Sequence, residues 1–471
     1  MAPALQTVDP AAEPFLSGRY APVRDEISAD HLPVTGTLPD DLVGHYFRNG
    51  PNPAFTPLGS YTFPLEGDGM IHGVWLEGGQ ARYANRWVRT NGLKAEERAG
   101  KALYGGIMTP AFVDMSLLGD DPDPGWPFKL DAFVNVIEHA GRCLALEEGT
   151  PPYEITAALE TVGRCDFGGG LPDGLTAHPK IDPETGEMVL FRYDVEKPFL
   201  TWATIGPDGA VTRPATEIEG VDQGFMIHDF AITPNYAVIV VGPLAFDLDA
   251  MMTGGSVLAW KPERGTRVAL VPRGGGEIRW VETEPFWAWH YANAYEDGDR
   301  IVLDYPGWSA PVIVVPPEER TRVTSGFRRA TIDPAGATMS VDRIDDVGSE
   351  FPRIDDRLVG RPHRYLTVAS RSGRAPLQPA EHDRLCRYDM QAGTSTHADT
   401  NAAIGEVCFA PRAGGTDELD GYYLAYGTDL DSGVSALYIW DASAFPADPV
   451  ATVALPQRVP NGLHGNWFPA R

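Results

Sequence analysis

The second half of the chain alternates short apolar runs with polar turns. From about residue 185 the runs are rich in Val, Ile, Tyr and Trp, a composition typical of β-strands. We predict strands within 188–195, 200–206, 236–242, 256–262, 267–273, 278–283, 300–306, 311–316, 337–344, 363–369, 422–429, 435–441 and 451–456. Segments such as GPDG (206–209) and DPAG (333–336) separate them, and their Gly, Pro and Asp residues suit tight turns. Repeated hairpins at this spacing predict an all-β, closed architecture.

Helical periodicity is scarce. The best helix candidate is 95–118, in which a charged half precedes an apolar half. No crisp repeat such as a WD signature is present, so strand number and turn spacing alone favour a β-propeller. No linker rich in Pro and Ser divides the chain, and we therefore expect a single domain.

The composition is that of a folded protein with many turns. Hydrophobic residues make up 43 % of the chain, and 51 Gly and 42 Pro are spread along it, which argues against disorder. The N-terminus lacks a basic start followed by an apolar run, so we expect a cytoplasmic protein without a signal or transit peptide. The best apolar stretch, 236–246, is interrupted by Gly and Pro and falls short of the roughly 20 residues that a membrane-spanning helix needs.

Charge and cysteine content exclude two classes of protein. The formal net charge of −27 makes a nucleic-acid partner improbable, because phosphate binding needs a basic surface. Solubility is the simplest explanation of this acidity. The four cysteines lie far apart without a CxxC pair, so we expect neither a zinc ribbon nor a disulfide framework, and reduced, mostly buried thiols.

Four of the eleven histidines stand in distinctive settings. They are His178 in TAHPK, His228 in IHDF, His290 in WHYANAYEDG and His464 in LHGNW. Their wide spacing differs from that of a helical HExxH motif or a zinc knuckle, whose ligands come from one short element. A closed β fold can still bring them to a central axis. Taken singly, each is more commonly a core or turn residue than a ligand.

Several long motifs in the same order carry a family resemblance. They include LPVTGTLPDDLVGHYFRNGPNP, GDGMIHG, YANRWVRT, LALEEGTPPYEI, TAHPKIDPETGEM and VPNGLHGNW. The chain thereby resembles the carotenoid cleavage oxygenases, a family that includes apocarotenoid- and stilbene-cleaving enzymes and the retinoid isomerase. The resemblance implies a seven-bladed β-propeller with a helical or loop cap over the substrate entrance. It further implies one propeller domain over 1–471, with the N-terminal segment 1–40 wrapped onto it.

The same resemblance implies a metal site with one Fe(2+) per chain. The metal ligands it implies are His178, His228, His290 and His464. Four neutral imidazoles suit iron(II) and leave two of six octahedral positions open, where O2 can bind. The carboxylates that accept the second ring N–H of the ligands are implied to be Glu148, Glu350 and Glu406. Val134 matches a position beside the open site, although it is equally well a plain strand residue. His72 and His139 are expected to be structural.

The implied activity is oxidative cleavage of a C=C double bond by O2 to give two carbonyl products. Stilbene-cleaving relatives commonly carry Lys directly before the first of these Glu, where this chain has Glu147. A carboxylate cannot stabilise a phenolate, which favours an apolar carotenoid or apocarotenoid substrate. That inference fails if Glu147 points away, or if Lys101, Lys129 or Tyr104 replaces the missing Lys.

Three alternatives stay open: a stilbene- or phenylpropene-cleaving oxygenase, a retinoid-isomerase-like enzyme that needs iron but no O2, and a metal-free propeller that serves as a binding module. Segments 107–119 and 243–255 correspond to the family's substrate entrance. An apolar patch there allows peripheral contact with a membrane, although core packing is the simpler explanation and the negative charge would repel anionic lipid. The sequence does not indicate the oligomeric state.

Overall fold

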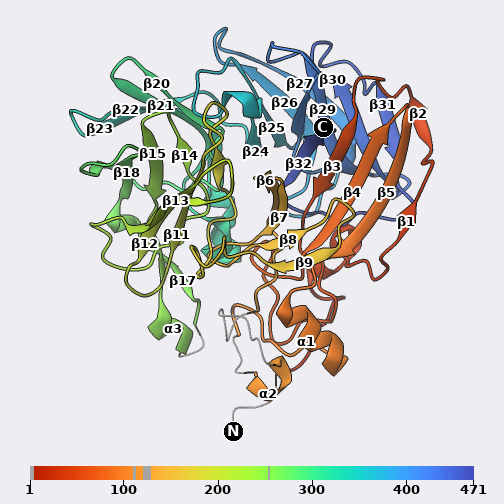
Figure 1. The fold of residues 1–471 in the computed structure, drawn as a ribbon, viewed down its shortest axis with the longest axis horizontal. Coiled ribbons are helices and arrows are strands. Elements are labelled where there is room, and N and C mark those ends of the chain that lie inside the picture. The colour runs from red at the N-terminus through yellow and green to blue at the C-terminus, as the bar shows by residue number, and fades with distance from the viewer. Residues whose placement is uncertain (1–4, 110–112, 120–128, 253–254, 471) are drawn as a thin grey trace.

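The protein is described by a computed structural model that covers residues 5–109, 113–119, 129–252 and 255–470 (Figure 1). It consists mainly of antiparallel β-sheets, which Figure 1 shows arranged side by side around the middle of the molecule. The all-β prediction is therefore confirmed.

The sheets follow one another along the chain. The first sheet has the order β1 (Ser28–Ala29), β5 (Gln80–Trp87), β4 (Met70–Glu77), β3 (Gly44–Arg48) and β32 (Gly465–Pro469). Three four-stranded sheets follow. The first of them contains β6 (Asn135–His139), β7 (Arg142–Leu146), β8 (Tyr153–Ile155) and β9 (Thr161–Arg164), and the second contains β10 (Lys180–Ile181), β11 (Met188–Tyr193), β12 (Leu200–Ile205) and β13 (Val211–Glu217). The third contains β14 (Ala231–Ile232), β15 (Tyr236–Val241), β18 (Thr266–Pro272) and β19 (Arg279–Thr283). A separate hairpin joins β16 (Leu244–Phe246) to β17 (Leu258–Trp260).

Two further sheets complete the set. One contains β20 (Asn293–Asp297), β21 (Arg300–Trp308), β22 (Ser325–Asp333) and β23 (Thr338–Arg343). The other has nine strands: β24 (Ser349–Arg353), β25 (Tyr365–Ser370), β26 (His382–Asp389), β27 (Thr394–Ile404), β28 (Cys408–Pro411), β29 (Gly421–Asp429), β30 (Ser435–Asp441), β31 (Ala451–Ala454) and β2 (Val34–Gly36). Within it, β27 bonds β29 only through Ala402–Ile404, so two smaller sets of strands are joined at one end.

Burial explains why these runs form strands. All six residues of β12 are buried, whereas β13, the outermost strand of the same sheet, is exposed or half-exposed along its length. A middle strand that is buried on both faces needs a near-continuous apolar run, which is the pattern seen in the sequence. Separate hydrophobic clusters fill the spaces between neighbouring sheets, for example between the β15–β18 and β21–β22 pairs.

One strand prediction is wrong. Segment 311–316 contains a short 3-10 helix, Val312–Val314, in place of a strand. Pro311 and Pro316 bracket it, and proline cannot donate the backbone hydrogen bond that a strand ladder requires. Ile313 and Val314 pack instead against the cluster around Trp287.

The two ends of the chain meet in the first sheet. β32, the last strand, pairs with β3 in register Gly44↔Pro469 to Arg48↔Gly465. The N-terminal segment also pairs with distant parts of the chain, since β1 pairs with β5 and β2 pairs with β31. These contacts tie the beginning of the chain to its end.

Helices are few and lie to one side of the sheets. They are α1 (Asn91–Ala99), α2 (Met115–Leu118) and α3 (Leu248–Met252), which Figure 1 places together at the lower edge. Short 3-10 helices occur at Pro14–Leu16, Gly18–Tyr20, Pro262–Arg264, Val312–Val314, Pro317–Arg322 and Asp356–Leu358.

The predicted helix over 95–118 is only partly correct. The Thr90 hydroxyl accepts from Leu93 N at the start of α1, and Gly100, with φ +66°, ends it. Residues 100–109 form turns, bends and one isolated bridge at Gly105, and 110–112 lie outside the described residues. No helix in the described ranges is long and apolar enough to cross a membrane. The four cysteines are free, and all but Cys143 are buried, as predicted.

Candidate metal centre

Seven strands begin within three residues of a residue that the sequence singled out. The pairs are Val134 with β6, His178 with β10, His228 with β14, His290 with β20, Glu350 with β24, Glu406 with β28 and His464 with β32. Residues from six of these strands line a cavity of about 470 Å³, which also touches His178, His290 and His464. Six of these seven residues are polar, and each lies within or just before the start of its strand.

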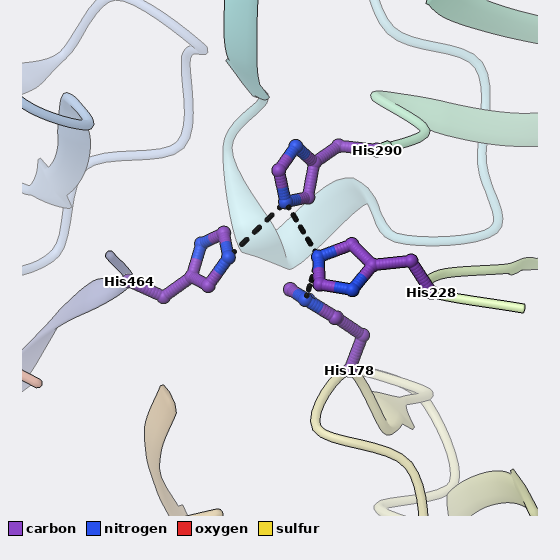
Figure 2. Close-up of side chains that lie close together, drawn as sticks. All are labelled: His178, His228, His290 and His464. Carbon is purple, nitrogen blue, oxygen red and sulfur yellow. Dashed lines mark hydrogen bonds between the residues drawn. The ribbon is translucent and has the colours of Figure 1, made fainter. Parts of the chain in front are cut away.

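The four histidines converge on one point (Figure 2). Nε2 of His228 lies 3.1 Å from Nε2 of His178 and 3.2 Å from Nε2 of His290, and Nε2 of His290 lies 3.1 Å from Nε2 of His464. All four ligand atoms lie within 4.8 Å of one another. Side chains from segments up to 286 residues apart therefore present the same type of nitrogen to one small volume, with His178 and His464 the most distant pair in sequence.

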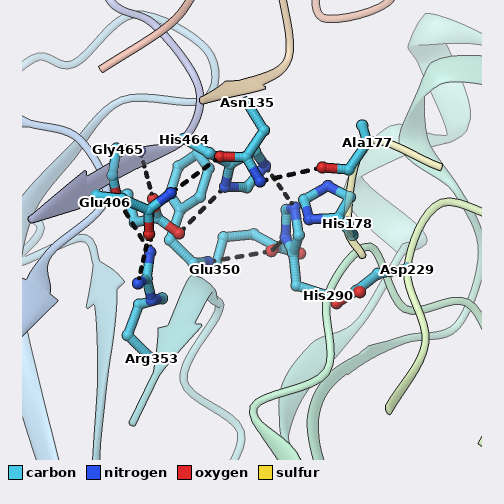
Figure 3. A network of polar contacts seen from close by, with 12 residues as sticks. Asn135, Ala177, His178, Asp229, His290, Glu350, Arg353, Glu406, His464 and Gly465 are labelled. Carbon is cyan, nitrogen blue, oxygen red and sulfur yellow. Dashed lines mark hydrogen bonds and ion pairs between the residues drawn. The ribbon is translucent and has the colours of Figure 1, made fainter. Parts of the chain in front are cut away.

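Three of the rings are oriented by carboxylates. Nδ1 of His290 lies 2.8 Å from Glu350 Oε2, and Nδ1 of His464 lies 3.1 Å from Glu406 Oε1 (Figure 3). Nδ1 of His228 contacts Glu148 Oε1. The structure thus brings each predicted carboxylate to a different histidine.

These carboxylate contacts determine where the ring protons lie. A neutral imidazole has one N–H, and a carboxylate partner keeps it at Nδ1. Nε2 of His228, His290 and His464 then carries a lone pair and no hydrogen. A hydrogen bond between two such nitrogens lacks its proton, so their close approach is stable only with a cation between them. The four-histidine group could therefore hold a metal ion.

Burial and charge keep two of the rings neutral. Burial, together with the neighbouring histidines, holds the pKa of His178 and of His290 well below the usual 6.5. Burial also lowers the pKa of His228, but the Glu148 carboxylate outweighs it, so the net shift is upward. Metal binding needs neutral imidazole, which His178 and His290 supply without losing a proton.

The carboxylates differ in charge balance. Burial raises the pKa of Glu350 to about 7, against the opposing hydrogen bond from Trp308. Glu406 is equally buried, but the Arg353 guanidinium and His464 hold its pKa at about 2.

The arrangement of the rings indicates a coordination geometry. Five of the six ring-centroid distances fall between 4.4 and 5.2 Å, and the sixth, between His228 and His464, is 6.4 Å. A tetrahedron gives six equal separations, and a square gives four short and two long. One long and five short separations match an octahedron with two neighbouring positions free of protein ligands.

Sequence analysis missed the residues that hold the carboxylates. The second oxygen of Glu148 accepts from the Tyr193 hydroxyl, and Glu350 Oε1 accepts from Trp308 Nε1 at 2.8 Å. Glu406 Oε2 accepts from Gly465 N at 2.8 Å and forms an ion pair with Arg353 at 3.2 Å. Arg353 lies in the same SEFPRID motif as Glu350, and this adjacency was a usable signal; nothing in the sequence links Tyr193 to Glu148.

A second missed residue links three ligand segments. Asp229 follows His228, and its Oδ2 accepts from the backbone N of Tyr291, directly after His290, at 2.9 Å. Its Oδ1 pairs at 2.7 Å with Lys180, two residues after His178. Asp229 therefore fixes the spacing of the segments that carry His178, His228 and His290.

The remaining predicted residues fall outside the group of four. His72 contacts the Tyr83 hydroxyl at 2.7 Å, and His139 contacts the Gly206 carbonyl at 2.9 Å. Both are buried and lie outside the four-histidine group. Val134 is buried, and its carbonyl accepts from His464 N at 3.2 Å.

Glu147 does not extend toward the histidines. Its Oε2 accepts from the backbone N of Asp131 at 2.6 Å and of Ala132 at 3.1 Å. Lys129 forms ion pairs with Asp68, Glu96 and Asp131, and its side chain is only 12 % exposed. Its charge is thus already compensated by protein carboxylates.

Comparisons with known proteins agree along the whole chain. Residues 20–469 match the family described as retinal pigment epithelial membrane protein. The chain is 36 % identical to a carotenoid cleavage oxygenase of Mycobacterium tuberculosis, over 97 % of each chain. A lignostilbene dioxygenase of Pseudomonas brassicacearum has a similar structure, with TM-score 0.89, 28 % identity, and 98 % and 99 % of the two chains covered. A cobalt-substituted apocarotenoid oxygenase of Synechocystis gives TM-score 0.82 at 29 % identity, with 98 % and 99 % covered.

Proposed function

The chain belongs to the family of the retinal pigment epithelial membrane protein and the carotenoid cleavage oxygenases, and we propose that it is an iron(II) dioxygenase that cleaves a C=C double bond of an apolar polyene. The observation that carries this proposal is the convergence of four imidazole Nε2 atoms, three of which have their only ring proton engaged by a carboxylate. Because every relative compared above is named as an oxygenase, the activity is that of an oxygenase.

Iron(II) is the metal that best suits this ligand set. His178, His228, His290 and His464 would hold it through borderline, uncharged donors, whereas a zinc site would favour four ligands at tetrahedral separations. Bound there, the metal would supply activation of O2 at the two positions without protein ligands. Glu148, Glu350 and Glu406 keep the ring protons at Nδ1, so that Nε2 stays available.

An apolar surface adjoins the histidines and suits a polyene. We call it the apolar wall; it includes Ile107, Met108, Tyr193, Phe246, Trp289 and Trp308. Among the described residues this cluster has five buried and eleven partly exposed apolar side chains. By contrast, the largest cluster of the core has nineteen buried and five partly exposed side chains. A cluster with mostly accessible members presents apolar surface to a ligand.

The apolar wall reaches the metal ligands directly. The Trp289 ring packs edge-on against His228 with centroids 5.2 Å apart. A substrate on the wall therefore lies beside His228, and the aromatic side chains orient it and exclude water.

The carotenoid class is preferred to the stilbene class. The Glu147 carboxylate is held by backbone amides and does not extend toward the histidines, so the inference from its charge fails. The preference rests instead on the apolar wall and on Lys129, whose charge three carboxylates already neutralise, so that it cannot pair with a phenolate. We expect aerobic incubation to give a higher kcat/KM with an apocarotenal than with resveratrol, with aldehydes identified by mass spectrometry. Cleavage of resveratrol alone would overturn the choice of substrate and leave the metal site in place.

We also propose that residues 1–471 form one seven-bladed propeller. The seven strands that begin within three residues of a predicted site residue support it, as does the pairing of β3 with β32, which would close the ring. The pairings of β1 and β2 support wrapping of segment 1–40 onto the propeller. Within this arrangement Val134 occupies the position that a histidine has in four other sheets, and we propose that its side chain shields an open coordination position.

Peripheral membrane contact is proposed for the helical side of the molecule. Leu117 in α2 and Leu248 in α3 are 43 % and 40 % exposed. Both helices lie at the same edge in Figure 1. Co-sedimentation with neutral lipid vesicles that is lost in Leu248→Glu is the expected result, and equal sedimentation of this variant would contradict the contact.

A further inference from the structure

In Glu148, Glu350 and Glu406, the two carboxylate oxygens have different partners. One oxygen contacts the Nδ1 of a histidine, and the other accepts from a donor further out. For Glu406 the outer donors are Arg353, which lines the cavity of about 470 Å³, and the backbone N–H of Gly465. For Glu148 the outer donor is Tyr193, and we find no other donor to that oxygen in the described part of the chain.

Tyr193 has two environments at once. Its hydroxyl contacts Glu148 Oε2, while Glu148 Oε1 contacts Nδ1 of His228. Its ring belongs to the apolar wall and packs against Phe246 with centroids 5.8 Å apart. One side chain therefore connects the surface assigned to the substrate with the partner of a metal ligand.

This connection is more vulnerable than that of Glu406. If Glu406 loses one of its two outer donors, the other donor stays in place. Loss of the Tyr193 hydroxyl leaves a largely buried carboxylate oxygen with no donor, which is costly, so the carboxylate is expected to rotate away from its present position. Rotation of Glu148 removes the contact that holds His228 in its ring orientation.

We propose that Tyr193 is a positioning residue of the metal centre, which fixes His228 through Glu148 with its hydroxyl and contacts substrate with its ring. The proposal deepens, and rests on, the proposed oxygenase function.

The test compares Tyr193→Phe with a matched control. Tyr388→Phe deletes the same atom from another buried tyrosine whose hydroxyl also contacts a carboxylate, that of Asp345, in a different hydrophobic cluster. Both variants are purified without metal and loaded with cobalt(II). Competition with a chelator measures affinity, and visible absorption of the bound cobalt reports its ligand geometry.

We expect Tyr193→Phe to bind cobalt(II) about tenfold or more weakly than wild type, because substitutions of residues that orient a metal ligand commonly weaken metal binding by that much. The visible spectrum of the bound cobalt should change as well. Its kcat should fall while KM for an apolar substrate stays, since the ring is retained. Tyr388→Phe should match wild type in affinity, spectrum and kcat.

The experiment distinguishes failure of the positioning role from failure of the proposed function. If wild type binds cobalt(II) and Tyr193→Phe shows the same affinity and spectrum, the positioning role is refuted and the proposed function stands. If wild type itself binds neither iron nor cobalt, the proposed function fails first.

Discussion

Phe351 illustrates at the residue scale how the backbone is shaped around the metal centre. Its φ is +54°, a left-handed value that costs a bulky residue roughly 1 kcal/mol or more. The irregularity in pairing between Glu350 and Arg353 occurs at the same place in β24. It orients Glu350 toward His290, and it stacks the Phe351 ring on His290 at 5.6 Å. Strain at this position is thus offset by contacts that form only around the four histidines.

A single histidine substitution tests the metal ligands. We expect His290→Ala to lose iron and activity together. The substitution removes an Nε2 atom that lies within 3.2 Å of those of both His228 and His464, and it leaves Glu350 without its histidine partner. Iron per chain, measured by elemental analysis, is the readout. His139→Gln is the control, since the His139 ring contacts the Gly206 carbonyl and lies outside the four-histidine group, so this variant should keep its iron. Full iron and turnover in His290→Ala would remove His290 from the site.

At the element scale, the first strand of each sheet does the positioning. A strand of two to five residues begins one to three residues after each of His178, His228, His290 and His464, so the sheet constrains the direction of the histidine side chain. β32 is special among them, because it follows His464 and pairs with a strand from the opposite end of the chain. The position of His464 therefore depends on β3.

Gly44 tests that dependence. A Cβ added there would lie 2.3 Å from the Phe468 carbonyl and 2.8 Å from the Trp467 ring, and the φ of +153° disfavours any other residue. We expect Gly44→Ala to destabilise the protein by about 2 kcal/mol or more through strain and separation of β3 from β32.

Thermal melting of the metal-free protein measures the effect, with Gly274→Ala as control, because a Cβ at Gly274 meets nothing within 4 Å. Equal melting temperatures of the two variants would show that the β3–β32 pairing contributes little.

At the scale of the whole molecule, the sequence patterns predicted secondary-structure elements better than they predicted the contacts between those elements. Apolar runs predicted twelve strands from residue 188 onward, because buried middle strands need such runs, and they failed at 311–316, where two prolines prevent pairing. They also missed strands with many polar or charged residues, such as β13, β22, β26 and β27. The four histidines were found through motifs, since segments such as TAHPK and LHGNW are local. Tyr193, Asp229 and Phe351 were missed, because a hydrogen bond across 45 residues or a left-handed φ leaves no local pattern.

The most direct test of the account combines iron analysis with cleavage of an apocarotenal under oxygen and under argon. We predict about one iron per chain and two carbonyl products that form only with oxygen, each labelled when ¹⁸O2 is supplied. Iron-loaded protein that converts the substrate equally under argon would contradict the oxygenase and favour an isomerase. Protein that binds no iron and leaves the polyene unchanged would contradict the four-histidine metal centre itself.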